Sequence, residues 1–64
     1  MKKTKTEYGY DLENETHTIS VDRTYDGWKN KWTYSCVVEN KKTKKWIYTT
    51  RVGEAKNIAK NNLV

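Results

Sequence analysis

The sequence has few residues that could cross-link or rigidify a fold. It contains one cysteine, one histidine, no proline and no phenylalanine in 64 residues. A single cysteine excludes an internal disulfide, so Cys36 is expected to be a reduced strand residue of a cytoplasmic protein. One cysteine and one histidine are too few for a zinc site, and we expect no metal or other cofactor. No apolar run is long enough to span a membrane or to form a signal peptide, so no membrane partner is expected.

Aliphatic side chains are also scarce. Valine, isoleucine and leucine together supply 10 residues, a proportion typical of disordered chains. Three tryptophans and five tyrosines offset this shortage, because each buried ring removes about 150–250 Å² from water. The length allows one domain. We therefore expect a single, small domain with an aromatic core; a chain that folds only on its partner is the alternative.

Charge is unevenly distributed along the chain, which carries 13 basic and 8 acidic residues. Residues 1–16 contain three lysines and four carboxylates, whereas residues 17–64 contain ten basic residues and four carboxylates. Residues 1–16 show no clear periodicity and are predicted to be a flexible N-terminal arm, although Tyr8, Tyr10 and Leu12 could form a short edge strand. Residues 17–64, which hold all the excess positive charge, are predicted to form the domain.

Three segments alternate with a period of two and are predicted to be strands: residues 17–25, 32–39 and 45–51. Asp26-Gly27 begins a turn between the first two, and residues 40–45 form a polar hairpin loop. After Gly53 the period changes, and the apolar residues Ala55, Ile58, Ala59 and Leu63 fall on one face of a helix. The predicted fold is α+β: a three-stranded antiparallel sheet packed against one C-terminal helix, in the order β-β-β-α.

The faces of this sheet are assigned by the size of their side chains. Ile19 and Val21 are expected to face the helix together with the rings of Trp32, Tyr34, Trp46 and Tyr48. The opposite face is rich in hydroxyls and carries Ser20, Asp22, Thr24, Thr33, Ser35, Val37, Ile47, Thr49 and Arg51. That face is either an ordinary solvated surface or a contact surface for a partner.

Basic residues interleave with aromatic ones in both predicted loops, at residues 25–31 and 41–46. Lysine and arginine neutralise phosphates and release counterions, which gives affinity for nucleic acid without sequence information. Trp28 lies outside the alternation and is placed either to stack on a base or to cap the core. Solubilising loop lysines are the alternative interpretation of the same pattern.

The sequence contains no group of residues that is typical of a catalytic site. His17 is interpreted as a satisfied or exposed strand residue, and Cys36 as a core residue whose thiol is silenced by burial. There is no phosphate-binding glycine loop and no carboxylate pair beside a cleft. We expect a protein that is not an enzyme.

Several features between Ile19 and Leu63 together resemble a known family: Ile19-x-Val21, Asp26-Gly27-Trp28, the strand Trp32–Val38, the basic hairpin Lys41–Lys45, and Tyr48-x-Thr50 before Glu54-Ala55. On these residues the chain resembles the small arm-type DNA-binding domains of phage and transposon tyrosine recombinases, which are similar in fold to plant AP2 domains. No catalytic recombinase domain is expected to follow. The resemblance therefore implies a free-standing DNA reader or a phage-type accessory protein.

The resemblance also implies that the sheet enters the major groove through the face opposite the helix. It nominates residues near base edges (Arg23, Thr33, Ser35, Thr49 and Arg51) and residues on phosphates (Lys29, Lys31, Lys42, Lys44 and Lys45), with Lys41 and Trp28 beside them. Simple alternation points Arg23 toward the helix side instead, and a snorkelling side chain would be needed to reconcile the two placements.

Duplex DNA is therefore the expected partner. Single-stranded nucleic acid or RNA is a second option, with Tyr25, Trp28 and Trp46 as stacking platforms. The alternative function is a small protein-binding module that docks on a host enzyme through Val37, Ile47 and Trp28. A phage-encoded protein is one example of such a module.

Overall fold

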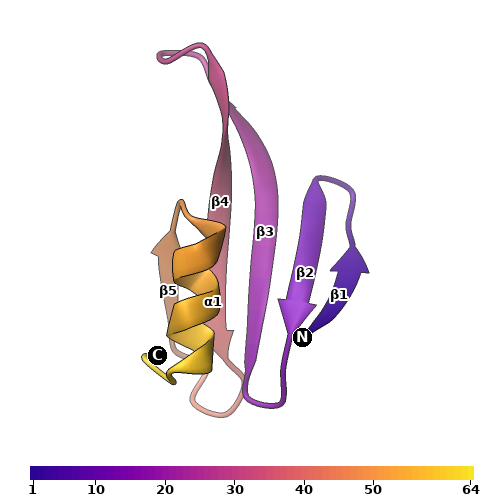
Figure 1. Cartoon of the computed structure of the whole chain (residues 1–64), viewed down its shortest axis with the longest axis vertical. Helices are drawn as coiled ribbons and strands as arrows, with labels where there is room; N and C mark the ends of the chain where they lie inside the picture. The colour runs from indigo at the N-terminus through magenta and orange to yellow at the C-terminus, as the bar shows by residue number, and fades with distance from the viewer.

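The computed structural model describes residues 1–64 and shows five strands followed by one helix. The elements are β1 (Lys2–Lys5), β2 (Gly9–Glu13), β3 (His17–Asp26), β4 (Lys31–Asn40), β5 (Trp46–Thr49) and α1 (Val52–Lys60). The strands form one antiparallel sheet in chain order, and α1 packs against β3, β4 and β5 (Figure 1). The predicted α+β class is confirmed, but the prediction of a three-stranded sheet is wrong, because the sheet has five strands.

The two additional strands come from the segment that was predicted to be an arm. β2 pairs with β3 so that Tyr10 lies opposite Val21 and Leu12 lies opposite Ile19. This register places Leu12 in the core and Tyr10 at its margin. β1 contains no apolar residue, and it is held on β2 by strand pairing and by Lys3 Nζ, which lies 4.4 Å from the ring centre of Tyr10.

The core is small and aliphatic rather than aromatic. Its buried apolar residues all project from one face of the sheet or from the facing side of α1: Leu12, Ile19, Val21, Cys36, Val38, Ala55, Ile58 and Ala59. All three tryptophans lie outside it, with Trp28 fully exposed and Trp32 and Trp46 exposed at 60% and 63%. The expectation of an aromatic core is therefore wrong.

The register of β5 explains part of this difference. Ile47 pairs with Val38 and Thr49 pairs with Cys36, so these two β5 residues face the helix. Trp46 and Tyr48 consequently lie on the open face, opposite to the predicted assignment. Two of the three buried residues of α1 are alanines. Because their side chains are small, the helix can pack close to the sheet, and a densely packed interior of this kind leaves little room for indole rings. We refer below to the helix side and the open face of the sheet.

The helix forms where the sequence predicts it. Ala55, Ile58 and Ala59 are buried against the sheet, and Glu54 and Lys60 lie at the ends where their charges suit the helix dipole. After the helix, Asn62 adopts a left-handed conformation with φ of 55°. The N–H of Leu63 then donates to the carbonyl of Ile58, which is a Schellman ending. Leu63 lies past this ending and is exposed, although it continues the predicted apolar stripe.

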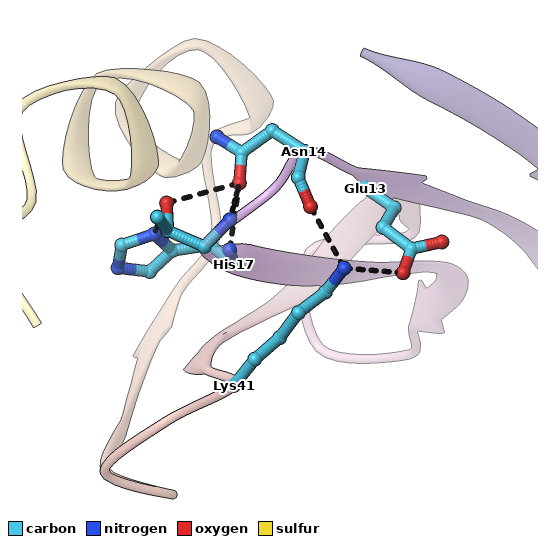
Figure 2. Close-up of polar contacts among 5 residues, drawn as sticks. Glu13, Asn14, His17 and Lys41 are labelled. Carbon is cyan, nitrogen blue, oxygen red and sulfur yellow. Dashed lines mark hydrogen bonds and ion pairs between the residues drawn. The ribbon is translucent and has the colours of Figure 1, made fainter.

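A polar network ties together the β2–β3 turn and the β4–β5 loop, which lie at the same end of the sheet (Figure 2). Asn14 Oδ1 accepts the N–H groups of Thr16 and His17, at 2.9 and 2.6 Å. Lys41 Nζ donates to Glu13 and, at 2.8 Å, to the carbonyl oxygen of Asn14. This end of the molecule is thus fixed by side chains as well as by strand pairing.

The close approach of β2 to β3 at Gly9 generates a stability prediction. A Cβ at Gly9 would overlap the carbonyl oxygen of Val21 and lie 3.0 Å from the Cα of Asp22. We expect Gly9→Ala to destabilise the fold by roughly 1–3 kcal/mol through steric overlap. Chemical denaturation followed by circular dichroism measures this change.

Gly53→Ala is the matched control, because a Cβ at Gly53 has no atom within 4 Å. Gly53 lies in the first turn of α1, where alanine is favoured over glycine by up to about 1 kcal/mol. We expect this variant to be as stable as the original chain or more stable. Equal unfolding midpoints for both variants would show that Gly9 of β2 is not held this close to Val21 and Asp22 of β3.

Candidate nucleic-acid interface

The hairpin of β3 and β4 extends past both of its neighbouring strands. Pairing of β2 with β3 ends at Asp22, and pairing of β5 with β4 ends at Cys36. The remaining part of the hairpin, residues 23–35, projects as a two-stranded ribbon that is visible as the long tip in Figure 1. We call this segment the ribbon. Beyond Arg23, whose N–H donates to the Tyr8 carbonyl oxygen at 3.0 Å, neither of its long edges is paired with another strand, and α1 does not cover it.

The tip of the ribbon is a structured turn. Asp26 Oδ1 accepts the N–H groups of Trp28 and Lys29, at 3.0 and 3.3 Å. The Tyr25 hydroxyl donates to the side-chain oxygen of Asn30, which has a left-handed φ of 52°. The residue with positive φ is therefore Asn30 and not Gly27. This geometry holds the Trp28 ring out in solvent.

On its helix side the ribbon carries a cluster of aromatic rings and one cation. Arg23 lies 4.8 Å from the ring centre of Trp32, and Tyr25 meets the same ring edge-on at 5.4 Å. The alternation that sends Ile19 and Val21 into the core places Arg23 and Tyr25 on this same side, beyond the covered part of the sheet. Arg23 therefore follows the simple alternation and not the face that the resemblance implied.

A cleft of about 410 Å³ runs along the edge of β4 that β5 leaves unpaired. It is lined by three cations, two aromatic rings and two hydroxyls, and by no carboxylate: Lys29, Lys31, Trp32, Thr33, Tyr34, Thr50 and Arg51. We call it the ribbon cleft. In such an arrangement the cations can contact phosphates while the exposed rings stack on bases.

The ribbon cleft gathers four of the residues nominated from the sequence: Lys29, Lys31, Thr33 and Arg51. Two more, Arg23 and Trp28, lie on the same ribbon, and Ser35 lies at its base with its hydroxyl 3.3 Å from that of Thr24. Trp32, Tyr34 and Thr50 also line the cleft, although the sequence pattern did not nominate them. The two rings were assigned to the core because of their size, although Arg23 in the same alternation marks the end of the buried strip.

The other nominated residues lie elsewhere. Thr49 is buried beneath α1, so its predicted position on an exposed reading face is wrong. Lys41 is paired with Glu13. Lys42, Lys44 and Lys45 occupy the loop after β4, at the opposite end of that strand from the ribbon tip. The two basic loops therefore do not form one surface.

The open face of the sheet is acidic. The register of the strands places five carboxylates and two lysines on it: Asp11, Glu13, Asp22, Asp26, Glu39, Lys2 and Lys31. A surface with this balance repels phosphates. It does not suit the DNA contact that the resemblance implied for this face.

A second groove without carboxylates lies between β1 and α1. It has a volume of about 600 Å³ and is lined by three lysines over an apolar floor: Met1, Lys3, Leu12, Asn14, Lys56, Asn57 and Lys60. This groove adds positive charge to the helix side, but it contains no aromatic ring. It can attract an anion but cannot stack on a base.

The buried titratable groups offer no nucleophile or general base at this surface. Burial, with a smaller effect of the Asp22 charge, raises the pKa of the Cys36 thiol, which disfavours the reactive thiolate. The His17 ring is buried with Nδ1 2.7 Å from the Thr16 hydroxyl and Nε2 3.0 Å from the Val64 oxygen. Both groups are satisfied parts of the core.

Comparison of the chain with protein-family models, curated proteins and solved structures finds no match. The resemblance to arm-type domains therefore stays a prediction, and the five-stranded sheet departs from the three strands that it implied. The single helix is nine residues long, and no helix is long and apolar enough to cross a membrane.

The Lys41–Glu13 ion pair generates a pH prediction. The hydrogen bond and the charge of Lys41 lower the pKa of the Glu13 carboxyl. A lowered pKa in the folded state stabilises the protein above the unfolded-state pKa, and this contribution is lost as the pH falls through the folded-state pKa. We expect Lys41→Met to raise the pKa of Glu13 and to weaken the pH dependence of unfolding in the acid range.

Carboxyl chemical shifts measured by NMR during an acid titration report this change. Lys42→Met is the matched control, since it removes the same charge from a neighbouring exposed position. The same rise in the pKa of Glu13 in both variants would contradict a specific pair.

Proposed function

We propose that this chain is a small, non-enzymatic nucleic-acid-binding protein, with DNA as its expected ligand. The ribbon cleft is the proposed contact surface. The observation that carries the proposal is the composition of that cleft, which combines three cations, two exposed rings and two hydroxyls with no carboxylate. The free Cys36 thiol suits the reducing cytoplasm that we propose as the compartment.

The cations and rings of the cleft divide the contact into two parts. Lys29, Lys31 and Arg51 are placed to neutralise phosphates, which supplies affinity that depends on salt. The exposed rings and the threonine hydroxyls are placed to meet bases or sugars. The T-shaped contact and the Arg23 stack hold Trp32 in one orientation, so less freedom is lost on binding.

The proposed mode differs from the one implied by the resemblance. Nucleic acid approaches the ribbon from its free β4 edge and from the helix side, where Arg23 and Arg51 lie. It does not lie on the open face, because the carboxylates there repel phosphates. The second groove, with Lys3, Lys56 and Lys60, extends the positive potential on the helix side.

Protein docking is the other candidate from the sequence, and the apolar patch that motivated it is not formed. Val37 lies on the open face opposite Ser20 and Tyr48. Ile47 lies on the helix side opposite Val38, and Trp28 lies at the ribbon tip. These three residues do not form one patch, although Val37 shares the open face with the exposed rings of Trp46 and Tyr48.

A salt titration with paired charge variants tests the proposal. With three phosphate contacts, the slope of log affinity against log salt is expected to be about −2 to −3. Lys29→Gln with Lys31→Gln should weaken binding and make the slope shallower by about 1.5, because two phosphate contacts are lost. Fluorescence anisotropy of a labelled oligonucleotide measures both quantities.

Lys42→Gln with Lys44→Gln is the matched control, since it removes the same charge from the opposite end of β4. We expect this pair to change the slope much less. Absence of binding at low salt would refute the proposal. Equal losses from the two pairs would show that the ribbon is not the contact surface.

A further inference from the structure

We infer that the ribbon cleft accepts a single-stranded segment of nucleic acid, whose unpaired bases stack on Trp32 and Tyr34. This inference rests on the proposed function and specifies its ligand. It is carried by the exposure of the rings, by the open edge of β4, and by the position of the cations at both ends of the cleft.

The rings are accessible in a way that suits stacking. Trp32 is 60% exposed although Arg23 covers one side of its ring, so a large part of the indole remains free. Tyr34 follows on the same side of β4 and is also exposed. A base can lie on such a surface whatever its identity, because every base has an aromatic face.

The edge of β4 leaves room for an extended strand beside these rings. From Lys31 to Ser35, β4 has no neighbour on the side where β5 would continue. Lys29 and Lys31 mark the tip end of this open edge, and Thr50 and Arg51 lie beyond the last paired residue of β5. Phosphates on either side of a stacked base therefore meet cations at both ends of the cleft.

A duplex fits this surface less well. Its bases are already stacked on one another and present only their edges in the grooves, so the faces of Trp32 and Tyr34 would have no partner. The side of the ribbon that faces away from the rings carries Asp26 beside Lys31, and Asp22 lies on the same face just outside the ribbon. A groove that enclosed the whole ribbon would bring its phosphates toward these carboxylates.

The first test compares three probes at equal salt concentration: oligothymidylate and oligouridylate of about ten nucleotides, and a blunt DNA duplex long enough to stay fully paired at that salt concentration. We expect the single strands to bind more tightly than the duplex by at least fivefold. The DNA and RNA probes separate the two sources of an unpaired base. A duplex that binds as tightly as the single strands would overturn the inference.

The second test uses two tryptophans of nearly equal exposure on opposite faces. Trp32→Leu should weaken single-strand binding by about 5- to 100-fold, the usual cost of losing a base stack. Trp46→Leu, which removes a ring from the open face, should leave binding unchanged. Circular dichroism of both variants verifies that the fold is retained, as expected for exposed positions.

Fluorescence provides a readout that does not depend on affinity. In Trp28→Phe with Trp46→Phe, Trp32 is the only tryptophan, and oligothymidylate should quench the tryptophan emission at saturation. In Trp28→Phe with Trp32→Phe, Trp46 is the only tryptophan, and its emission should not be quenched even at oligonucleotide concentrations that saturate this weaker-binding variant. Binding without quenching of Trp32 would overturn the inference but leave the proposed function standing, whereas no binding by any probe would refute both.

Discussion

The length of the buried strip on β3 and β4 determines most of this structure. The strip ends at Val21 and Cys36, because the next residues on the same side are Arg23 and Tyr34. The nine-residue helix is about 14 Å long, whereas a ten-residue strand is about 33 Å long. One short helix cannot cover both strands, so the ribbon is left outside the core by geometry.

The two ends of the hairpin consequently differ in how they are held. At one end, the Lys41–Glu13 pair and the Asn14 turn join neighbouring loops, while His17 and Asn40 both contact the Val64 oxygen, at 3.0 and 2.9 Å. Beyond the Arg23–Tyr8 hydrogen bond at its base, the ribbon is held by its own strand pairing, by the turn at its tip and by exposed side-chain contacts such as Arg23 over Trp32. Ligand-binding segments are commonly drawn from such locally less stable parts of a fold, which agrees with placing the site on the ribbon.

Alternation and helical periodicity predicted β3, β4, β5 and α1, because each carries apolar residues at the spacing of its element. β1 could not be predicted in this way, since Lys2–Lys5 has no apolar side chain and is held by pairing. The sequence also could not show which side chains of β5 face the helix. Trp46 and Ile47 are both apolar, and alternation alone does not say which of them packs against α1. The cations at residues 29 and 31 were found from their clustering. The second basic cluster was wrongly joined to them, because two consecutive hairpin loops lie at opposite ends of the strand that connects them.

The position of the rings is the strongest argument that the ribbon serves a ligand. This chain has few aliphatic residues, and its core uses nearly all that are available on the helix side. The rings could have enlarged a marginal core, since small domains bury a limited share of their surface. They are exposed instead, and on the ribbon they gather beside Arg23 and the ribbon cleft. Exposed apolar surface that clusters in this way is typical of interaction sites, which supports the proposed contact surface, and the adjacent cations are the reason that we propose a polyanion as its partner.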